Sequence, residues 1–333
     1  MESAPAVTLP ASALESFPRF SLYNSPYPAH DAGCAVDLYP GEGAAPGGSD
    51  PAPSPVAGEV LDVRSVRAPP KPYAESEDHL ILVDVGEHVA RVLHVDPAVE
   101  PGDRVAVGDR LGTLVRAGFF APWVANHVHL GFRRHDQHLT RATGSLPLAV
   151  EAPVEAVPWD GTGRVAAVGE TFVVLDEPGH PAPGERYAGL AARVAPDAAD
   201  TAPRVEGEGG VDRPRGGDAV VIDGGLVHYR GGGALPAEVG TPASRVGTPA
   251  VPSAEQRALW FLGERVGTVR GRTVEWADLA IRANGRRITG LSLFAARDAL
   301  GAKLVCPGHD FAVGDRVAVD LAPADDPTVL SGG

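Results

Sequence analysis

Short runs in which apolar residues alternate with polar ones, separated by glycine and proline turns, extend over residues 27–150. The clearest run is residues 127–133, where valine, leucine and phenylalanine occupy every second position. Side chains two positions apart on a β-strand point to the same face. This run therefore predicts a strand with one apolar face and with His127 and His129 together on the other.

Other segments carry a similar strand signal, since they are rich in β-branched and aliphatic residues and are bounded by turn residues. We expect strands at residues 56–63, 79–85, 90–95, 164–168, 171–175, 219–222, 265–269 and 303–306. A helix is expected near residues 292–300. The predicted fold class is mainly all-β.

An aspartate directly after a glycine recurs between the expected strands. Asp103, Asp109 and Asp315 all have this setting, within phrases of similar sequence. Aspartate is favoured in turns because its side chain accepts a hydrogen bond from nearby backbone. We interpret these phrases as a recurring turn followed by a strand, and Asp103 and Asp109 as turn residues.

Changes in composition suggest how the chain divides into domains. Residues 231–253 are rich in glycine, proline and alanine and repeat the phrase Val-Gly-Thr-Pro-Ala, which is typical of a linker. We predict an irregular lead-in at residues 1–20, a β domain at 21–150, a β-rich domain at 151–230, a linker at 231–253 and a β-rich C-terminal domain at 254–333.

The charge of the chain restricts its partners. The formal net charge is −14, and only two of the 29 basic residues are lysines, Lys71 and Lys303. An acidic, lysine-poor surface stays hydrated in salt, which suggests a halophile-like protein of a salty cytoplasm, although a GC-rich genome also favours arginine. Nucleic acid is not an expected partner, because phosphate binding needs clustered positive charge.

Neither the start of the chain nor any later segment has the pattern of an export signal or a membrane span. We therefore expect a cytoplasmic protein without a membrane span. Cys34 and Cys306 are the only cysteines, too few for a disulfide framework or for a zinc site built of cysteines.

Histidines concentrate in the first part of the chain and indicate where its chemistry lies. His127 and His129 share one strand face, and His30, Asp37 and His94 lie upstream. Catalytic zinc takes three nitrogen or oxygen ligands and a water. Two histidines and an aspartate as ligands, with two further histidines beside them, would supply such a site.

An ordered set of phrases, covering about a third of the chain, resembles the LytM/lysostaphin-type zinc metallopeptidase family. That family opens with a histidine and an aspartate, continues through a glycine-rich strand pattern and closes on His-x-His. The corresponding phrases here are His30 to Asp37-Leu38-Tyr39-Pro40, residues 55–60, residues 93–95, residues 99–112 and His127-Val128-His129-Leu130.

The resemblance implies a fold, a cofactor and an activity for residues 21–150. The fold is an antiparallel β-sandwich or barrel of the duplicated hybrid motif type, and the activity is zinc-dependent, metalloendopeptidase-like hydrolysis of a peptide bond. By position, His30, Asp37 and His129 match the family's zinc ligands. His94 and His127 match its two other histidines, which assist the attack of the water. The expected substrate is a peptide or a peptide-containing molecule.

One spacing departs from the family pattern. The first histidine and the aspartate are typically four residues apart in the family, whereas His30 and Asp37 are seven apart. Seven positions along a strand do not share a face unless a bulge or loop intervenes, and Gly33 could provide it. Asp31 or Cys34 are alternative ligands.

Two other classes of function compete with a hydrolase. A non-catalytic relative would keep the fold as a binding or scaffolding module, which the spacing and the absent export signal favour. A phosphocarrier would use two facing histidines, such as His94 and His129, and would need no metal. Lys71 lies between two prolines, which is the wrong setting for a lipoyl or biotinyl carrier. No chemistry is assigned to residues 151–333.

Overall fold

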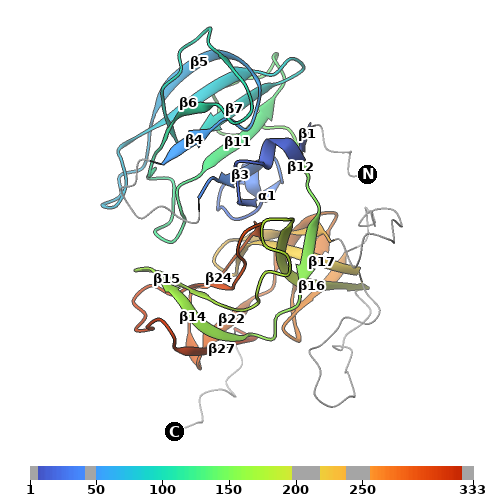
Figure 1. Cartoon of the computed structure of the whole chain (residues 1–333). Helices are drawn as coiled ribbons and strands as arrows, with labels where there is room; N and C mark the ends of the chain where they lie inside the picture. Colours follow the sequence, from blue (N-terminus) through green and yellow to red (C-terminus); the bar gives the residue numbers. More distant parts are fainter. Residues whose placement is uncertain (1–6, 42–49, 197–217, 238–255, 325–333) are drawn as a thin grey trace. The chain divides into compact units, whose positions relative to one another are not determined.

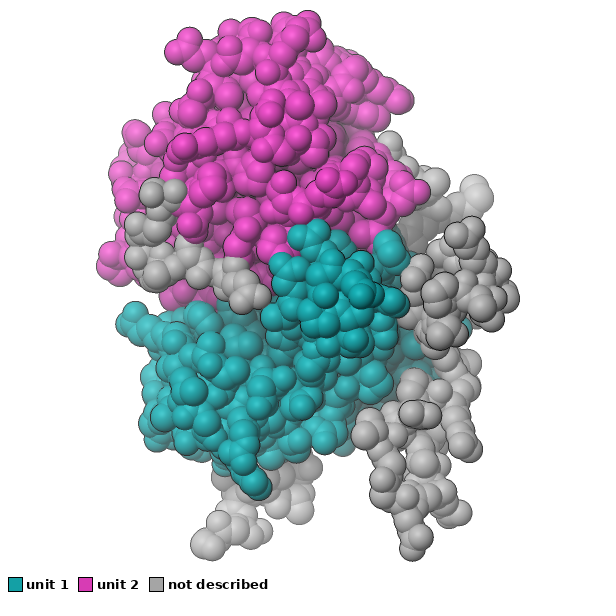
Figure 2. All heavy atoms as spheres, viewed as in Figure 1, with its two compact units in different colours: residues 1–2, 153–333 teal, residues 3–152 magenta. Residues whose placement is uncertain are grey.

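A computed structural model describes four parts of the chain: residues 7–41, 50–196, 218–237 and 256–324 (Figure 1). The chain forms two compact units, an N-terminal unit of residues 3–152 and a C-terminal unit of residues 153–333 (Figure 2). Strands make up 51% and helices 3% of the structure, which confirms the all-β prediction. No helix in the described ranges is both long enough and apolar enough to span a membrane.

The described residues of the N-terminal unit form one single-turn α-helix, one 3-10 helix and twelve strands. Its helices are η1 (Ala11–Leu14) and α1 (Pro28–Asp31), and its strands are β1 (Val7–Pro10), β2 (Arg19–Ser21), β3 (Ala35–Tyr39), β4 (Pro51–Pro53), β5 (Gly58–Arg67), β6 (Glu77–Asp84), β7 (Val89–Leu93), β8 (Val95–Pro97), β9 (Arg104–Val105), β10 (Arg110–Leu114), β11 (Val128–Arg133) and β12 (Leu148–Glu151).

The main sheet of this unit is antiparallel throughout and has the strand order β2-β3-β11-β7-β6-β5-β9. A smaller antiparallel sheet has the order β4-β10-β8. Strand β11 lies in the main sheet between β3 and β7, and its apolar residues Val128 and Leu130 are fully buried. The alternation along residues 127–133 therefore sets the two faces of a central strand, as predicted.

The turns between strands repeat one hydrogen-bond pattern. The carboxylate of Asp103 accepts a hydrogen bond from the N–H of Glu100, and that of Asp109 from the N–H of Ala106, both at 2.8 Å. Asp315 of the C-terminal unit does the same. The glycine before each aspartate has a positive φ, which side chains disfavour. These aspartates are turn residues, as the sequence predicts.

A fully buried arginine holds the long connection between β11 and β12. The guanidinium of Arg133 donates to the backbone carbonyls of His138, Arg141 and Thr143. The neighbouring Arg91 donates to the Leu139 carbonyl at 2.6 Å, and burial, together with Arg133, lowers its pKa to about 10. Backbone carbonyls thus solvate both buried cations and fix the loop.

In the C-terminal unit, the part of the chain that the structure describes forms fifteen strands. They are β13 (Val154–Val157), β14 (Thr162–Val168), β15 (Phe172–Leu175), β16 (Tyr187–Pro196), β17 (Asp218–Leu226), β18 (Gly231–Pro236), β19 (Arg257–Phe261), β20 (Glu264–Arg270), β21 (Thr273–Trp276), β22 (Leu279–Ala283), β23 (Arg286–Arg287), β24 (Gly290–Leu293), β25 (Ala295–Ala296), β26 (Lys303–Val305) and β27 (Arg316–Pro323).

Six of these strands close into an antiparallel barrel. The order is β16-β17-β18-β21-β20-β19, and β19 pairs back with β16. A second run of pairs, β17-β24-β26-β15-β14-β27-β22-β23, extends from the barrel strand β17. One hydrophobic cluster, with Val194, Ile222 and Leu259 fully buried, joins the two sets of strands.

The structure divides the chain differently from the expected domains. Strands from residues 151–230 and from 254–333 form one barrel, so these segments make a single unit, and β18 occupies the start of the expected linker. Residues 238–253 of that linker lie outside the described part. The expected lead-in contributes β1, which pairs with β12, and the buried Phe17 and Phe20. Pairing between distant segments, which composition does not report, causes these differences.

The prediction of a helix near residues 292–300 is wrong. Strands β24 and β25 occupy its first part. All four residues of β24 are buried, and the strand is hydrogen-bonded on both sides, to β17 and to β26. A strand buried on both faces shows no alternation, so periodicity cannot distinguish it from a buried helix.

Replacing Arg133 by methionine tests whether its guanidinium stabilises the N-terminal unit. Three backbone carbonyls lose a charged donor, so we expect the free energy of unfolding to fall by about 2 kcal/mol or more. Urea unfolding measures this change. The matched control is Arg134→Met, because the Arg134 side chain is 57% exposed and we expect it to change little. Equal effects of the two substitutions would contradict the role of Arg133.

Candidate metal centre

The register between two neighbouring strands creates the core of the site. In the antiparallel pair of β3 and β11, His129 lies directly opposite Asp37. Residues opposite each other in such a pair place their side chains on the same face and in contact. The Nδ1 atom of His129 lies 3.0 Å from Oδ1 of Asp37.

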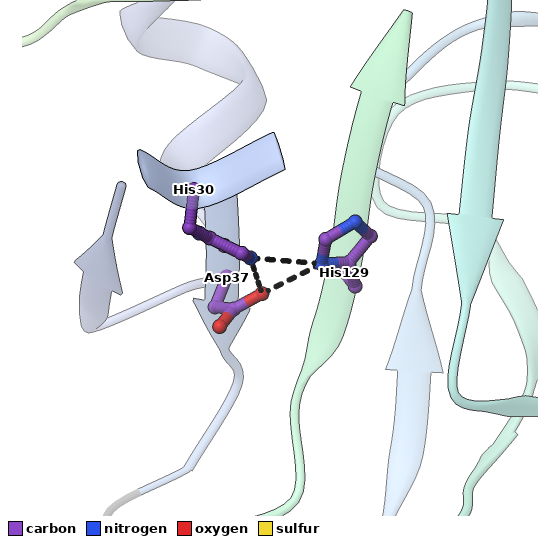
Figure 3. Close-up of side chains that lie close together, drawn as sticks. All are labelled: His30, Asp37 and His129. Carbon is purple, nitrogen blue, oxygen red and sulfur yellow. Dashed lines mark hydrogen bonds and ion pairs between the residues drawn. The ribbon is translucent and has the colours of Figure 1, made fainter. Parts of the chain in front are cut away.

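His30 reaches the same point from the helical turn α1 (Figure 3). Pro28 stands at the start of this turn, where its fixed φ favours a helix. The turn ends in a Schellman pattern, since the N–H of Gly33 bonds the carbonyl of His30 and the N–H of Cys34 bonds that of Ala29. Gly33 has φ +62°, and a Cβ there would lie 2.6 Å from the hydroxyl oxygen of Tyr23.

This turn explains the seven-residue spacing between His30 and Asp37. The residues between them complete a helical turn instead of a strand bulge, so the rule that alternate residues share a face does not apply. The alternative ligands are elsewhere: Asp31 is half-exposed, and the thiol of Cys34 points to the carbonyl of Ala32 at 3.6 Å. Gly33 breaks the strand geometry between His30 and Asp37 as expected, but it does so at the end of a helical turn and not in a strand bulge.

Three ligand atoms of the predicted set converge. Nε2 of His30 lies 3.1 Å from Nδ1 of His129 and 3.2 Å from Oδ1 of Asp37. Zinc bonds of about 2.0–2.1 Å at tetrahedral angles separate neighbouring ligand atoms by about 3.3 Å. The observed separations therefore fit one zinc-sized cation. Within the described ranges, His30, Asp37 and His129 form the group of histidine, cysteine and acidic side chains able to hold a metal.

Hydrogen bonds on the far side of two rings determine which ring nitrogen donates and which accepts. His30 donates from Nδ1 to the carbonyl of Leu22 at 2.7 Å, and His127 donates from Nδ1 to the carbonyl of Ala125 at 2.9 Å. In the neutral rings Nε2 is therefore an acceptor. Nε2 of His127 lies 3.3 Å from Oδ1 of Asp37. Acceptors this close repel one another unless a cation or a proton lies between them.

His94 stands beside this group at the bend between β7 and β8. Its φ is +72°, an uncommon conformation for a residue other than glycine. Its ring centroid lies 5.2 Å from that of His127 and 5.7 Å from that of His129. The five predicted residues thus gather in one place, with the three predicted ligands grouped and the two other histidines next to them.

Two further residues belong to this site although the sequence did not indicate them. Asp78, fully buried, accepts a hydrogen bond of 2.6 Å from Nδ1 of His94. The ring of Phe120 stacks on His127, with centroids 4.4 Å apart, and meets His94 edge-on. No motif marks Asp78, which comes to His94 through tertiary structure: β6 pairs with β7, and the N–H of His94 bonds the carbonyl of His79.

The electrostatics of the site depend on burial and on the carboxylate. Burial would raise the pKa of Asp37, but the imidazoles of His127 and His30 and its hydrogen bonds hold that pKa well below the ordinary value. Burial lowers the pKa of His129 to about 4, although the hydrogen bond that its ring donates to Asp37 opposes this change. At neutral pH, Asp37 is therefore ionised and His129 is neutral, the states in which both bind metal.

The low pKa of His129 predicts how the metal-free protein responds to acid. The folded pKa of about 4 lies below the unfolded value of 6.5, so between these pH values the unfolded chain binds more protons. The stability contributed by His129 is lost as pH falls from 6.5 to 4, by up to about 3 kcal/mol. Urea unfolding of chelator-treated protein should show a shallower pH slope in His129→Gln and an unchanged slope in the exposed control His135→Gln. Equal slopes in all three proteins would contradict the assignment.

Comparisons with known proteins give two kinds of similarity. Residues 8–150 match the N-terminal domain, and residues 155–322 the C-terminal domain, of a family described as a domain of unknown function, DUF8155. No curated protein matches the chain.

Two solved structures resemble part of the chain. The M23 metalloprotease Pseudoalterin, described as from deep sea, is 16% identical, with a TM-score of 0.26 over 37% of this chain and 69% of its own. The catalytic domain of a mutant of the prophage-encoded M23 protein EnpA from Enterococcus faecalis is 21% identical, with a TM-score of 0.23 over 34% and 72%. Values this low assign no activity. The two family models together cover nearly all of the described residues, and the chain belongs to the DUF8155 family.

Proposed function

We propose that the N-terminal unit is a zinc-dependent hydrolase of peptide or amide bonds. The observation that carries the proposal is the convergence of His30 Nε2, Asp37 Oδ1 and His129 Nδ1 within 3.0–3.2 Å of one another. A set of two imidazoles and a carboxylate suits zinc, and three protein ligands leave a position open for catalysis. The resemblance in the order of sequence phrases supports the same conclusion.

The surrounding residues supply proton transfer and orientation. When bound, zinc would lower the pKa of its water ligand and polarise an amide carbonyl. His127 presents Nε2 to the site because its Nδ1 proton is engaged by a backbone carbonyl. His94 is held by Asp78 in the same tautomer, so its Nε2 is free to take or give a proton. We assign these two histidines to the proton transfers at the attacking water and the leaving amine.

Asp78 acts through His94 as a positioning residue. Its carboxylate fixes the imidazole orientation and stabilises the imidazolium that forms when His94 takes a proton. The backbone N–H of His79 donates to the other carboxylate oxygen at 2.8 Å, so Asp78 itself is fixed. Burial would raise the pKa of Asp78, but His94 lowers it, which keeps the carboxylate ionised.

One observation favours the second candidate, a non-catalytic binding or scaffolding module that holds a metal. The exposed fractions are 2% for Asp37, 3% for His127 and 7% for His94, and Phe120 covers the two histidines. Of the predicted ligands, His129 has the most exposed side chain, at 16%. Buried metal sites of closed coordination are structural. Protein that holds zinc but cleaves no member of a peptide library supports this candidate.

The charge of the site argues against a phosphocarrier. His94 and His129 lie edge to face with centroids 5.7 Å apart, but each has its Nδ1 hydrogen-bonded to a buried carboxylate, Asp78 and Asp37 respectively. A phosphoryl group arriving between these carboxylates would meet two like charges in a site of low dielectric.

Metal content measured by elemental mass spectrometry tests the proposal. We expect about one zinc per wild-type chain, and its loss in His129→Ala because a ligand atom is removed. The control His138→Ala changes an exposed histidine outside the site and should retain the metal. Wild-type protein that holds no metal after zinc is added back would refute the proposal.

Replacing Asp78 by asparagine tests the assignment of His94. Loss of the carboxylate misorients His94 and destabilises its protonated form, so we expect hydrolysis of a peptide substrate to fall about 10- to 100-fold. Zinc content should stay unchanged, because Asp78 contacts no predicted ligand. The control Asp84→Asn removes a carboxylate from the same strand, β6, and should leave the rate unchanged. Unchanged hydrolysis in Asp78→Asn would exclude a role of this pair in proton transfer.

A further inference from the structure

A pocket of about 700 Å³ lies in the C-terminal unit, apart from the predicted ligands. The connection between β21 and β22, the hairpin of β22 and β23, and the loops at residues 227–230 and 306–311 line it. Sites for small molecules and cofactors have volumes of about 300–1,000 Å³. The pocket therefore has room for a ligand of the size of a metabolite.

One part of the pocket lining is apolar and aromatic, and polar or charged residues form the rest. The half-buried side chains of Trp276, Ile288 and Phe311 supply the apolar surface, and they pack against the hydrophobic cluster that contains the buried Leu279 and Ile281. Burial raises the pKa of the Cys306 thiol, also in the lining, to about 11, so the thiol carries no charge at neutral pH. Such a surface suits a ring or a short apolar chain.

The charged residues of the lining lie at the exposed edge. Arg230, Arg286 and Arg287 are exposed, and only Arg286 has a carboxylate partner within the described residues, Asp310 at 2.7 Å. One other carboxylate, Asp278, lines the pocket. Two arginines thus remain for a ligand, in a chain whose net charge is −14. Arginine presents a planar set of donors that matches a carboxylate or a phosphate.

Contacts between the loops hold the pocket in shape. His309 donates from Nε2 to the carbonyl of Gly169 at 2.9 Å and accepts the N–H of Phe311 at Nδ1. The ion pair of Arg286 with Asp310 joins the β22–β23 hairpin to the same loop. A cavity formed before binding costs less ordering when a ligand enters.

We propose that this pocket binds a small organic anion that has a flat or short apolar body and a single acidic group. The body lies against Trp276, Ile288 and Phe311, and the acidic group pairs with Arg230 and Arg287 at the edge. This binding needs no metal, so it is independent of the hydrolase proposed for the N-terminal unit.

Fluorescence titration of the full chain with anilinonaphthalenesulfonate tests the proposal, since this probe combines an aromatic body with one anionic group. We expect saturable binding at one site. Arg230→Ala and Arg287→Ala should each weaken it about fivefold through loss of one charge pair. Thr289→Trp, which places a bulky ring on an exposed position of the lining, should abolish it. The control Arg270→Ala, an exposed arginine of β20 outside the lining, should bind as wild type.

Competition experiments define the ligand class. Benzoate and phenyl phosphate carry a carboxylate and a phosphate on the same ring, so displacement of the probe by either supports the proposal and shows which acidic group is preferred. Neutral N-phenylnaphthylamine should bind more weakly than the anionic probe. Equal affinity for the neutral and anionic probes, no saturable binding, or identical effects of Arg230→Ala, Arg287→Ala and Arg270→Ala would overturn the proposal.

Discussion

One carboxylate oxygen, Oδ1 of Asp37, lies within 3.3 Å of nitrogens from three imidazoles, and the N-terminal unit is organised around that contact. The carboxylate is buried and ionised, so it needs positive charge close by. Two of the three nitrogens have their ring protons engaged elsewhere and approach as acceptors. A cation bound by His30, Asp37 and His129 would neutralise the carboxylate and use the lone pair of His30, which is the physical basis of the metal site that we propose.

The fold fixes this arrangement through backbone as much as through side chains. The register between β3 and β11 places His129 opposite Asp37. The helical turn α1, which ends in a Schellman pattern, positions His30 beside them. Carbonyls of Leu22 and Ala125 select the tautomers of His30 and His127, while Asp78 selects that of His94. Outer partners of this kind orient the rings before any ligand arrives, as the metal binding and proton transfer that we propose would require.

The C-terminal unit has a different chemistry. Its barrel closes through the pairing of β16 with β19, which leaves no free edge in that set of strands. Its described residues hold no comparable cluster of metal ligands, and its distinctive feature is a pocket that combines an aromatic and apolar lining with exposed arginines. The chain thus combines a candidate metal centre in one unit with a candidate anion-binding pocket in the other, and neither chemistry requires groups from the other unit.

Local pattern predicted the all-β class and many of the strands, although not β24 and β25, and the resemblance in the order of the phrases indicated the region of the site. Alternation over residues 127–133 placed His129 on a polar face, and the order of the phrases singled out His30 and Asp37. Tertiary structure decided the rest: the helical turn that carries His30, the meeting of Asp78 with His94, and the closure of one barrel from segments expected to be separate domains. Periodicity reports which face a residue occupies in its own strand. Which strands become neighbours depends on apolar burial and backbone pairing summed over the whole chain.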